Sequence, residues 1–568
     1  MELLVDLFGY LSIIVHGLTI LSQSMALGGA LFLMLLARPL ASRLGRTDIA
    51  AGAAALSWHE GPRSCVRSVA RIAGYAAVAL LLSEAATVAL QAAVLTETVG
   101  LSLKEVLTAD FAIAGLVKMA AAAAMAGILL GLRERAPALP LLALTVIELA
   151  AATLTTHAAA RLDNRGWLLA VEGLHQFGAA IWIGGLPGFL LTLARVHDSA
   201  AFRLVGARFS RMSIVGVACI LVSGITMSLL YIGSWQGFYG TAFGVMVGAK
   251  VALFLMLLGL GGMNFLMVER QRANPATSVN RLRRFAEVEF GIGIAIFFAA
   301  ASLTSVPPAV DLTRDRVSWH EIVARNTPQW PHLSSPDRDS LALPALQEKL
   351  DAEAAAKQAA PPAAFIPGAG ELPPRNAADI AWSEYNHHWA GLIVAAVGLL
   401  ALLNHAGLRS ARHWPLIFLA LAVFLFFRSD PETWPMGDIG FFDSLRDVEV
   451  LQHRFFVLLI VVFACFEWRV RATNWTSRHA ALVFPLLCAA GGTMLLTHSH
   501  AIANVKDQLL IELIHTPLAL TGIAAGWARW LQIRLNPREN PVAWQIAGWV
   551  WPLCILFCGL LLLGYREA

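Results

Sequence analysis

Long apolar segments alternate with short polar ones along most of the chain, and this pattern predicts membrane-spanning helices. A helix needs roughly 20 apolar residues to cross the ~30 Å of hydrocarbon in a bilayer, and runs of that length recur throughout the sequence. The predicted helices span residues 4–37, 71–95, 108–131, 138–158, 168–194, 212–232, 242–267, 287–306, 384–404, 414–428, 452–468, 479–500, 508–528 and 543–564. The predicted fold class is all-α, a polytopic helical membrane protein with about 14 transmembrane helices.

A long polar segment separates the predicted helices into two blocks. Residues 307–383 are rich in Pro, Ala and charged residues, a composition typical of an extended linker. The sequence therefore predicts three parts: an eight-helix membrane domain at residues 1–306, a Pro/Ala-rich linker at 307–383, and a six-helix, His-rich membrane domain at 384–568. Within the linker, residues 341–357 are compatible with a short surface helix.

Basic residues predict the orientation of the chain in the membrane. Lys and Arg are enriched on the cytoplasmic side of membrane proteins, and here arginines gather in every second loop. The basic loops lie around residues 38–67, 133–135, 195–208, 270–284, 409–412, 469–471 and 529–538. Both termini are therefore predicted outside the cytoplasm. The opening segment has no cationic n-region, so it is interpreted as a first membrane helix and not as a removed signal peptide.

Composition narrows the class further. The 568 residues are 57% apolar and only 14% charged, which excludes a soluble globular protein and makes the lipid bilayer the first partner. The net charge of +4 comes mostly from short loops that orient the chain, so no nucleic-acid partner is predicted. The six cysteines include no CxxC pair, so neither a disulfide framework nor a zinc knuckle is indicated.

Eight histidines fall near the predicted outer face of the membrane, although imidazole is costly in hydrocarbon. Ionisable residues inside membrane segments are rare and usually mark a pathway or a ligand site. These residues are His157, His175, His387, His388, His453, His498, His500 and His515. Polar side chains also snorkel at helix ends, so any single one of them could be an interfacial residue. Their gathering on one face predicts metal binding or haem binding.

A weak internal repeat links the two blocks. In each block, a helix end that carries His is followed by a returning helix with Glu-x-x-His near its start. The two units are Thr156-His157-Ala158 with Glu172-Gly173-Leu174-His175, and Thr497-His498-Ser499-His500 with Glu512-Leu513-Ile514-His515. The spacing places Glu and His on one helix face, and both units run in the same direction through the membrane, as in a parallel repeat. Chance similarity of two apolar hairpins is the alternative.

Imidazole chemistry defines the candidate metal ligands. Neutral imidazole suits copper, zinc, nickel and haem iron, and helix bundles build such sites from inward side chains of facing helices. The candidate metal ligands are His16, His157, His175, His387, His388, His453, His498, His500, His515, Glu172 and Glu512. Copper(I) favours two or three imidazoles or soft thioethers. Met25 and Met34 follow His16 along the first helix, where they could line a copper path or fill the core.

Haem b is the alternative ligand for the second block, since it needs two imidazoles on opposite sides of a macrocycle. The candidate haem ligands are His388, His453, His498 and His515. A di-iron carboxylate site would need two further glutamates that no helix supplies at the outer face. No residue is predicted to be catalytic. In the first block, Glu84 and Lys118 lie at similar depth and are predicted to form an ion pair, either structural or on a proton path.

Several short motifs in the first block point to a known family. The start of one helix shows His175, several small residues, and then Trp182-Ile183-Gly184-Gly185-Leu186. The further matching residues are His157-Ala158-Ala159-Ala160, Phe209-Ser210, Ser223-Gly224, Gly240-Thr241 and Gly244 to Lys250. Over residues 157–267 the chain thus resembles the CopD copper-resistance family of bacterial inner-membrane proteins. The second block, with Val450-Leu451-Gln452-His453-Arg454 and Thr497-His498-Ser499-His500, is similar to the C-terminal extension of longer members.

The resemblance implies copper transport or copper handling at the bacterial inner membrane, often beside a periplasmic copper-binding partner of the CopC type. It supports His157 and His175 as functional residues. In an inner membrane, the outer side that the basic loops predict for both termini is the periplasm. The leading hypothesis is copper transport or handling through periplasm-facing histidine sites. A transporter or metal-binding membrane protein is expected in preference to an enzyme. The alternative is a membrane b-type cytochrome with bis-His haem in the second block, passing electrons to quinone or copper.

Overall fold

The computed structural model describes residues 2–42, 62–161, 163–195, 199–274, 280–312, 316–341, 377–473, 475, 477, 479–497 and 505–567. Every regular element among these residues is a helix. Twelve helices are long and apolar enough to cross a membrane, and two shorter apolar helices, Ala138–Thr153 and Ala480–Leu495, accompany them. Together they correspond to the fourteen predicted segments, so the prediction of an all-α polytopic membrane protein is confirmed.

The first block runs from the N-terminus to residue 303. Its long helices are α2 (Phe8–Phe32), α4 (Pro62–Thr98), α6 (Asp110–Gly127), α7 (Ala138–Thr153), α9 (Arg165–Ala179), α10 (Leu186–Arg195), α11 (Ser199–Ile232), α13 (Ala242–Ala273) and α14 (Asn280–Leu303). Short elements lie at their ends: α1 (Glu2–Asp6), η1 (Leu33–Ala37), α5 (Leu103–Thr108), η2 (Ile128–Leu132), η3 (Arg133–Arg135), α8 (His157–Ala160), η4 (Ala180–Gly184) and α12 (Trp235–Tyr239).

The second block follows the linker region. Its helices are α17 (Ala377–His405), η7 (Arg409–Leu416) with α18 (Ile417–Arg428), α20 (Val448–Ala472), η8 (Ala480–Leu482) with α21 (Val483–Leu495), α22 (Val505–Arg534) and α23 (Pro541–Leu563). The short helix α19 (Phe441–Ser444) lies in the loop before α20. Between the blocks are η5 (Ala309–Asp311), α15 (Trp319–Asn326) and η6 (Arg338–Ser340). The possible helix at 341–357 lies almost entirely outside the described residues.

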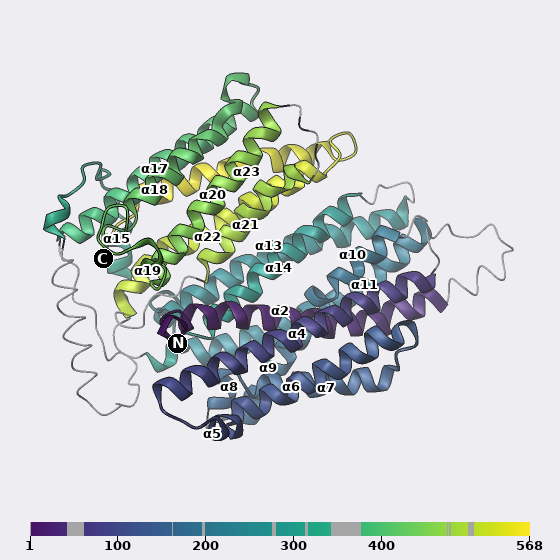
Figure 1. Cartoon of the computed structure of the whole chain (residues 1–568). Helices are drawn as coiled ribbons and strands as arrows, with labels where there is room; N and C mark the ends of the chain where they lie inside the picture. Colours follow the sequence, from purple (N-terminus) through teal and green to yellow (C-terminus); the bar gives the residue numbers. More distant parts are fainter. Residues whose placement is uncertain are drawn as a thin grey trace.

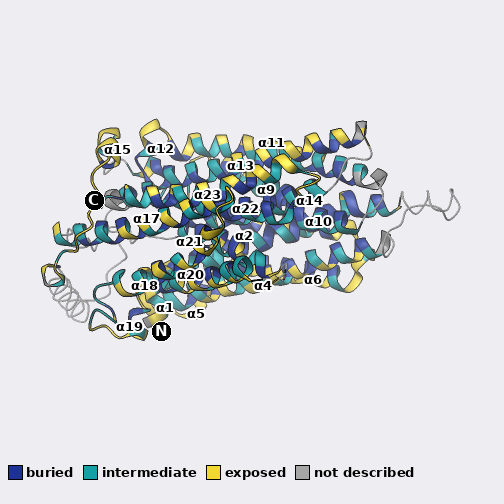
Figure 2. Ribbon diagram, turned by 90° about the horizontal axis from the view of Figure 1, so that it is seen from above, coloured by how far each residue is buried: buried dark blue, intermediate teal, exposed yellow. Residues whose placement is uncertain are grey.

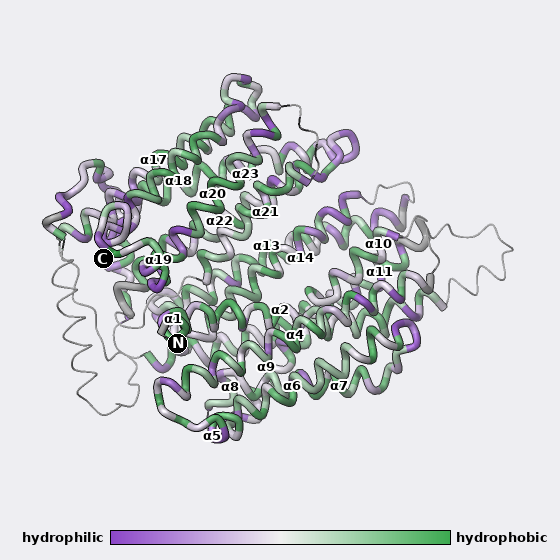
Figure 3. The backbone as a smooth tube through the Cα atoms, in the orientation of Figure 1, coloured by the Kyte–Doolittle hydropathy of each residue, from purple (hydrophilic) through white to green (hydrophobic). Residues whose placement is uncertain are grey.

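The long helices run side by side, and both chain termini lie at the same end of the bundle (Figure 1). That end also holds α5, α8, α15 and α19, and we call it the terminal end. Hydrophilic residues gather at the two ends and hydrophobic residues between them (Figure 3). Figure 2 shows buried residues where helices face one another and exposed residues along the outward surfaces. In the apolar stretch of α2, 72% of the residues are buried, against 11% in α11, so α2 is central and α11 faces lipid.

Two predicted helices differ from the observed ones. The predicted helix 138–158 ends at Thr153, because Thr153, Thr155 and Thr156 donate hydroxyl hydrogen bonds back to nearby carbonyls and compete with the helix pattern. His157 therefore starts the separate short helix α8. The predicted helix 168–194 is interrupted by the π-helical turn η4, after which α10 begins at Leu186.

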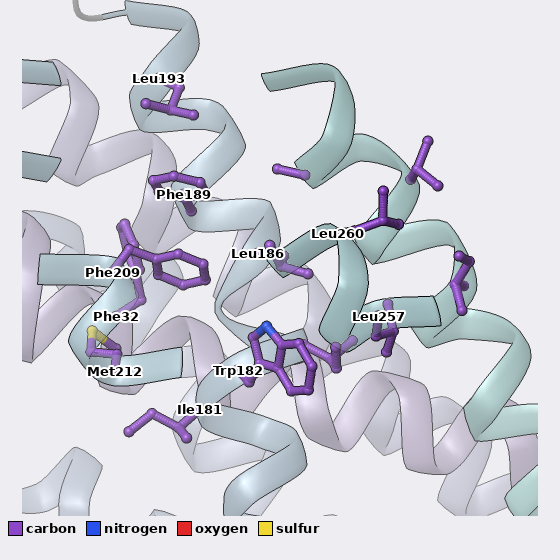
Figure 4. Close-up of a cluster of buried hydrophobic side chains, with 14 of the residues drawn as sticks. Phe32, Ile181, Trp182, Leu186, Phe189, Leu193, Phe209, Met212, Leu257 and Leu260 are labelled. Atoms are coloured by element: carbon purple, nitrogen blue, oxygen red, sulfur yellow. The ribbon is translucent and has the colours of Figure 1, made fainter. Parts of the chain in front are cut away.

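The turn η4 allows a close approach to α2. A Cβ on Gly28 of α2 or on Gly184 of η4 would overlap the backbone of the other element. Around this contact, Trp182 is 2% exposed and Phe189 stacks on Phe209 with ring centroids 4.2 Å apart (Figure 4). The residues Trp182 to Leu186 quoted for the family resemblance therefore fix the position of α9 and its His175 against α2.

The two blocks share part of one hydrophobic core. Leu496, Ala519 and Ile523 of the second block belong to the same buried cluster as the core of the first. The helix α22 packs against α13 and α14, and Trp530 donates its indole N–H to Glu287 at 3.1 Å. The division into domains at 1–306, 307–383 and 384–568 stays a prediction, with this contact surface between the two membrane parts.

A glycine at this contact provides a test of how the blocks are held together. A Cβ on Gly291 of α14 would overlap the indole ring of Trp527, whereas a Cβ on Gly127 meets nothing within 4 Å. We expect Gly291→Ala to lower the stability of the purified protein by about 1–3 kcal/mol, since overpacked side chains must shift. Thermal unfolding in detergent measures the change, and Gly127→Ala is the matched control. Equal unfolding temperatures for the two variants would show that the contact with Trp527 is loose.

Candidate functional site

His157 opens the short helix α8 at the terminal end of the first block. Its Nε2 atom is buried and has no hydrogen-bond partner. The backbone carbonyls of Leu303 and Thr304 lie against the ring, and Arg161 lies nearby in an ion pair with Asp311 at 2.7 Å. Burial, and then the charge of Arg161, lower the pKa of His157 below its usual range. The imidazole is therefore neutral and carries an unused nitrogen, as a metal ligand must.

His175 lies about three turns into α9, and its tautomer follows from its partner. The Nδ1 atom lies 3.0 Å from the hydroxyl of Ser223 on α11. That hydroxyl donates its own hydrogen to the carbonyl of Cys219 at 2.6 Å, so it must accept from His175. Nε2 then carries the lone pair. Histidines that bind metals usually donate their other N–H to such a partner, which fixes the orientation of the ring.

Glu172 and Lys250 lie beside His175 in a buried polar network. Glu172 accepts a hydrogen bond from Gln176 at 3.1 Å, and Gln176 accepts one from Gln23 of α2 at 3.1 Å. The ammonium group of Lys250 on α13 interacts electrostatically with both Glu172 and His175. The predicted ligand Glu172 is thus engaged by Gln176 and lies close to a cation, whereas His175 keeps its Nε2 for a ligand.

Met227 was missed by the sequence analysis. It lies on α11 one turn from Ser223 and one turn before Tyr231, so these three residues share a helix face. Met227 packs against the cluster that contains Ala158, the neighbour of His157. Its thioether therefore lies between the levels of His157 and His175. The spacing of four from the Ser223-Gly224 pair is the signal that could have identified it.

His16 lies in a different polar group. Lys118 of α6 forms an ion pair with Glu84 of α4 at 2.6 Å, which confirms the predicted pair, and both side chains are about 5% exposed or less. The charge of Lys118 acts on His16 and also on Glu148 of α7. The structure thus associates His16 with a cation and two carboxyl groups, and not with His157.

The second block brings two predicted histidines together. The rings of His387 on α17 and His515 on α22 have centroids 6.0 Å apart, and Tyr565 stacks on His387 at 3.7 Å. Nδ1 of His387 donates to the carbonyl of Ser383 at 2.8 Å, and Nδ1 of His515 donates to that of Ile511 at 3.0 Å. In both rings Nε2 is then the nitrogen with the lone pair.

His388 differs from its neighbour His387. Its Nδ1 accepts the backbone N–H of His332 at 2.7 Å, and its Nε2 lies 2.9 Å from the carbonyl of Tyr565. Both nitrogens are therefore used by the backbone. His332, which is not among the predicted ligands, also lies 3.5 Å from Glu384. These contacts hold the described part of the linker against the end of α17.

The other predicted ligands of the second block do not join His387 and His515 in the described residues. His453 of α20 lies 3.0 Å from the carboxylate of Asp430. Although burial raises the pKa of Asp430, the hydrogen bond and charge of His453 lower it more, so the net pKa lies below the usual range. Glu512 is buried with one carboxylate oxygen, Oε2, without a partner. His498 and His500 lie outside the described residues. Within the described ranges, no group of three or more His, Cys, Asp or Glu side chains is arranged to hold a metal ion.

Comparison with known proteins gives two matches. The sequence model of the family described as Copper resistance protein D matches residues 203–303, which cover most of α11 and all of α13 and α14. Copper transport protein CutJ of Bacillus subtilis (strain 168) is 33% identical over 162 residues, which is 28% of this chain and 29% of CutJ. No solved structure matches the chain. The resemblance noted for residues 157–267 is therefore confirmed, with a match that starts later and continues through α14.

Proposed function

Because residues 203–303 are a CopD copper-resistance domain within a multi-pass membrane protein, we propose that the chain transports copper across the membrane, with His157 and His175 as ligands on the route. The name of the related protein CutJ, a copper transport protein, supports the same substrate. The observation that carries the proposal is the geometry of His175. Its Nδ1–H is held by Ser223, which presents the lone pair of Nε2 inside the bundle.

Copper(I) fits the side chains along this route. The ion would meet the unpartnered Nε2 of His157 first, then the thioether of Met227, and then Nε2 of His175. Imidazole and thioether are ligands that Cu(I) accepts readily. The cation of Lys250 near His175 keeps the ion from binding too tightly, and a transport site must also release its substrate.

The orientation follows from the charge distribution. The helices that lead into arginine-rich loops, among them α6, α10 and α20, end on the side of the bundle opposite the chain termini (Figure 1), and basic loops face the cytoplasm. We therefore place both termini, His157 and the pair His387/His515 on the periplasmic side of a bacterial inner membrane. A periplasmic copper-binding protein of the CopC type would deliver or receive the ion at this surface.

The second block supplies the candidate second copper site. His387 and His515 present two imidazoles whose Nδ1 atoms are bonded to helix carbonyls, an arrangement suited to copper. We leave His388 out of this site because the backbone uses both of its nitrogens. The same contacts disfavour any haem that would depend on His388. Asp430 engages His453, so we assign His453 a role in holding the loop before α20.

Copper flux into proteoliposomes tests the proposed function. Wild-type protein should move Cu(I), kept reduced by ascorbate, down its gradient, and a His157→Ala/His175→Ala variant should lose this flux. His320→Ala removes an exposed histidine of α15 and is the matched control. A double variant that transports copper at the wild-type rate would refute the route, and a wild-type protein without flux would refute the function.

Copper binding at His157 should persist into mildly acidic solution. Only neutral imidazole binds copper, and the lowered pKa of His157 keeps its ring neutral below the usual histidine pKa of about 6.5. Protonation therefore competes with copper only at lower pH. Competition titrations of a His175→Ala/His387→Ala variant between about pH 5 and 7.5 measure this. An affinity that already falls through pH 6.5 would contradict the expected environment of His157.

A further inference from the structure

Glu148 of α7 is the most isolated carboxyl group in the described part of the first block. The residue is 0% exposed, and neither carboxylate oxygen has a hydrogen-bond partner. It lies five residues before the end of α7, about 8 Å below the terminal end at 1.5 Å per residue. A carboxylate without partners at this depth is costly, so Glu148 holds a proton when the site is at rest.

One cation lies within electrostatic reach of two carboxyl groups here. Lys118 is bonded to Glu84 at 2.6 Å, and the charges of both act on Glu148. Two states keep the net charge of this buried region constant. In one, no copper is bound, Lys118 pairs with Glu84 and Glu148 is protonated. In the other, a monovalent cation has entered the copper route, Glu148 is ionised, and Lys118 lies near both carboxylates. A proton can therefore leave Glu148 without leaving the carboxylate uncompensated.

The helices around α7 contribute few other titratable groups. The helix α7 packs against α6, α9 and α2. From α6 comes Lys118, and from α2 comes His16, on which Lys118 also acts. The titratable groups of α9 at this depth are Glu172 and His175, which face Lys250. Glu84 of α4 is the remaining titratable group whose charge acts on Glu148.

Polar side chains lie on one face of α2 between this group and the copper route. His16 and Gln23 are seven residues apart on α2 and so lie on one helix face. Gln23 donates to Gln176, and Gln176 donates to Glu172, which lies beside His175. In a core where charge is costly, a cation that arrives at His175 favours the loss of a proton nearby.

We propose that Glu148 is a proton-binding site coupled to copper binding at His175, so that the chain exchanges Cu(I) for a proton. When Cu(I) binds His175, Glu148 releases its proton and the carboxylate is stabilised by Lys118; when copper leaves, Glu148 is protonated again. One positive charge enters and one leaves, and no electron is transferred. This inference rests on the proposed copper transport and adds the coupling ion to it.

Proteoliposomes with a pH-sensitive dye inside test the coupling. For wild type we expect Cu(I) flux to change the internal pH, with protons moving opposite to copper, and an imposed pH gradient to accumulate copper severalfold. Glu148→Gln should lose both coupled effects, including in any downhill copper flux that remains. Glu148→Asp should retain them. Glu97→Gln, at the exposed end of α4, is the matched control. Coupled flux in Glu148→Gln equal to wild type would overturn the proposal and leave copper transport intact.

A second measurement does not depend on transport. Neutral imidazole and thioether ligands release no proton when they bind Cu(I), so proton release in weakly buffered detergent solution reports on Glu148. Wild type should release about one proton per Cu(I) bound at His175, and Glu148→Gln, checked for a monodisperse elution profile, should release none. Equal proton release from the two proteins would overturn the coupling even if the liposomes showed no copper flux.

Discussion

Replacing His175 by alanine should lower copper affinity roughly 100-fold and reduce copper flux in proportion. The variant removes a ligand whose lone pair is oriented by Ser223, so no other side chain can take its place at that point of α9. Ser223→Ala should act in the same direction but less strongly, by about tenfold, because the ring then rotates and exchanges tautomers. Competition titration with a Cu(I) chelator measures both effects.

The comparison needs a control on the same helix. Thr226 lies on α11 and donates its hydroxyl to Val222 at 2.8 Å, as Ser223 does to Cys219, but it forms no hydrogen bond to any histidine that the structure describes. Thr226→Val should therefore leave copper affinity unchanged. If Ser223→Ala behaves like Thr226→Val while His175→Ala weakens binding, His175 is a ligand whose orientation does not depend on Ser223. If all three variants bind like wild type, His175 is not a copper ligand.

The membrane helices and their depth could be predicted from the sequence because both depend on local hydrophobicity. The pair Glu84/Lys118 is an example. Two opposite charges at one depth in neighbouring helices are expected to pair, because an unpaired charge inside the membrane is costly. The interruption of the predicted helix 168–194 could not be predicted. It depends on the approach of Gly28 and Gly184, which are far apart in the sequence.

Helix rotation explains why the candidate site was predicted only in part. His387 and His388 are adjacent, so they point about 100° apart around α17, although their depth is nearly equal. The first faces His515, and the second is bonded to the backbone at His332 and Tyr565. The prediction that both belong to one histidine cluster depended only on their similar depth in the membrane. Met227, and the role of Ser223 beyond its place in a family motif, were missed for the same reason, since packing places their helix face beside α9.

Tyr565 shows how the C-terminal segment contributes to the second site. The residue is 2% exposed, stacks on His387 and donates its phenol to Glu567. Burial, and then the charge of Glu567, raise the pKa of the phenol well above its usual range, so it remains protonated. The sequence could not predict this contact, because a tyrosine after the last helix has no periodic pattern that assigns it a partner.

Glu467→Gln should destabilise the protein more than Gly291→Ala does. Glu467 of α20 is 0% exposed, and it accepts hydrogen bonds from Arg471 at 2.6 Å and from Arg529 of α22 at 2.9 Å. The side chain of Trp551 lies against both guanidinium groups. Removal of the carboxylate leaves two buried cations facing a neutral amide, and breaking a buried pair in this way costs about 3–5 kcal/mol.

Unfolding of the purified protein in detergent measures this loss, with Glu539→Gln on the exposed loop before α23 as the control. Copper affinity of the folded fraction should not change, because Glu467 lies toward the opposite end of α20 from His453 and far from His387 and His515. A Glu467→Gln variant as stable as Glu539→Gln would mean that water or lipid headgroups compensate the two arginines. In that case the charge cluster would be a surface feature of the end of the bundle opposite the chain termini and not part of the core that holds α20 against α22.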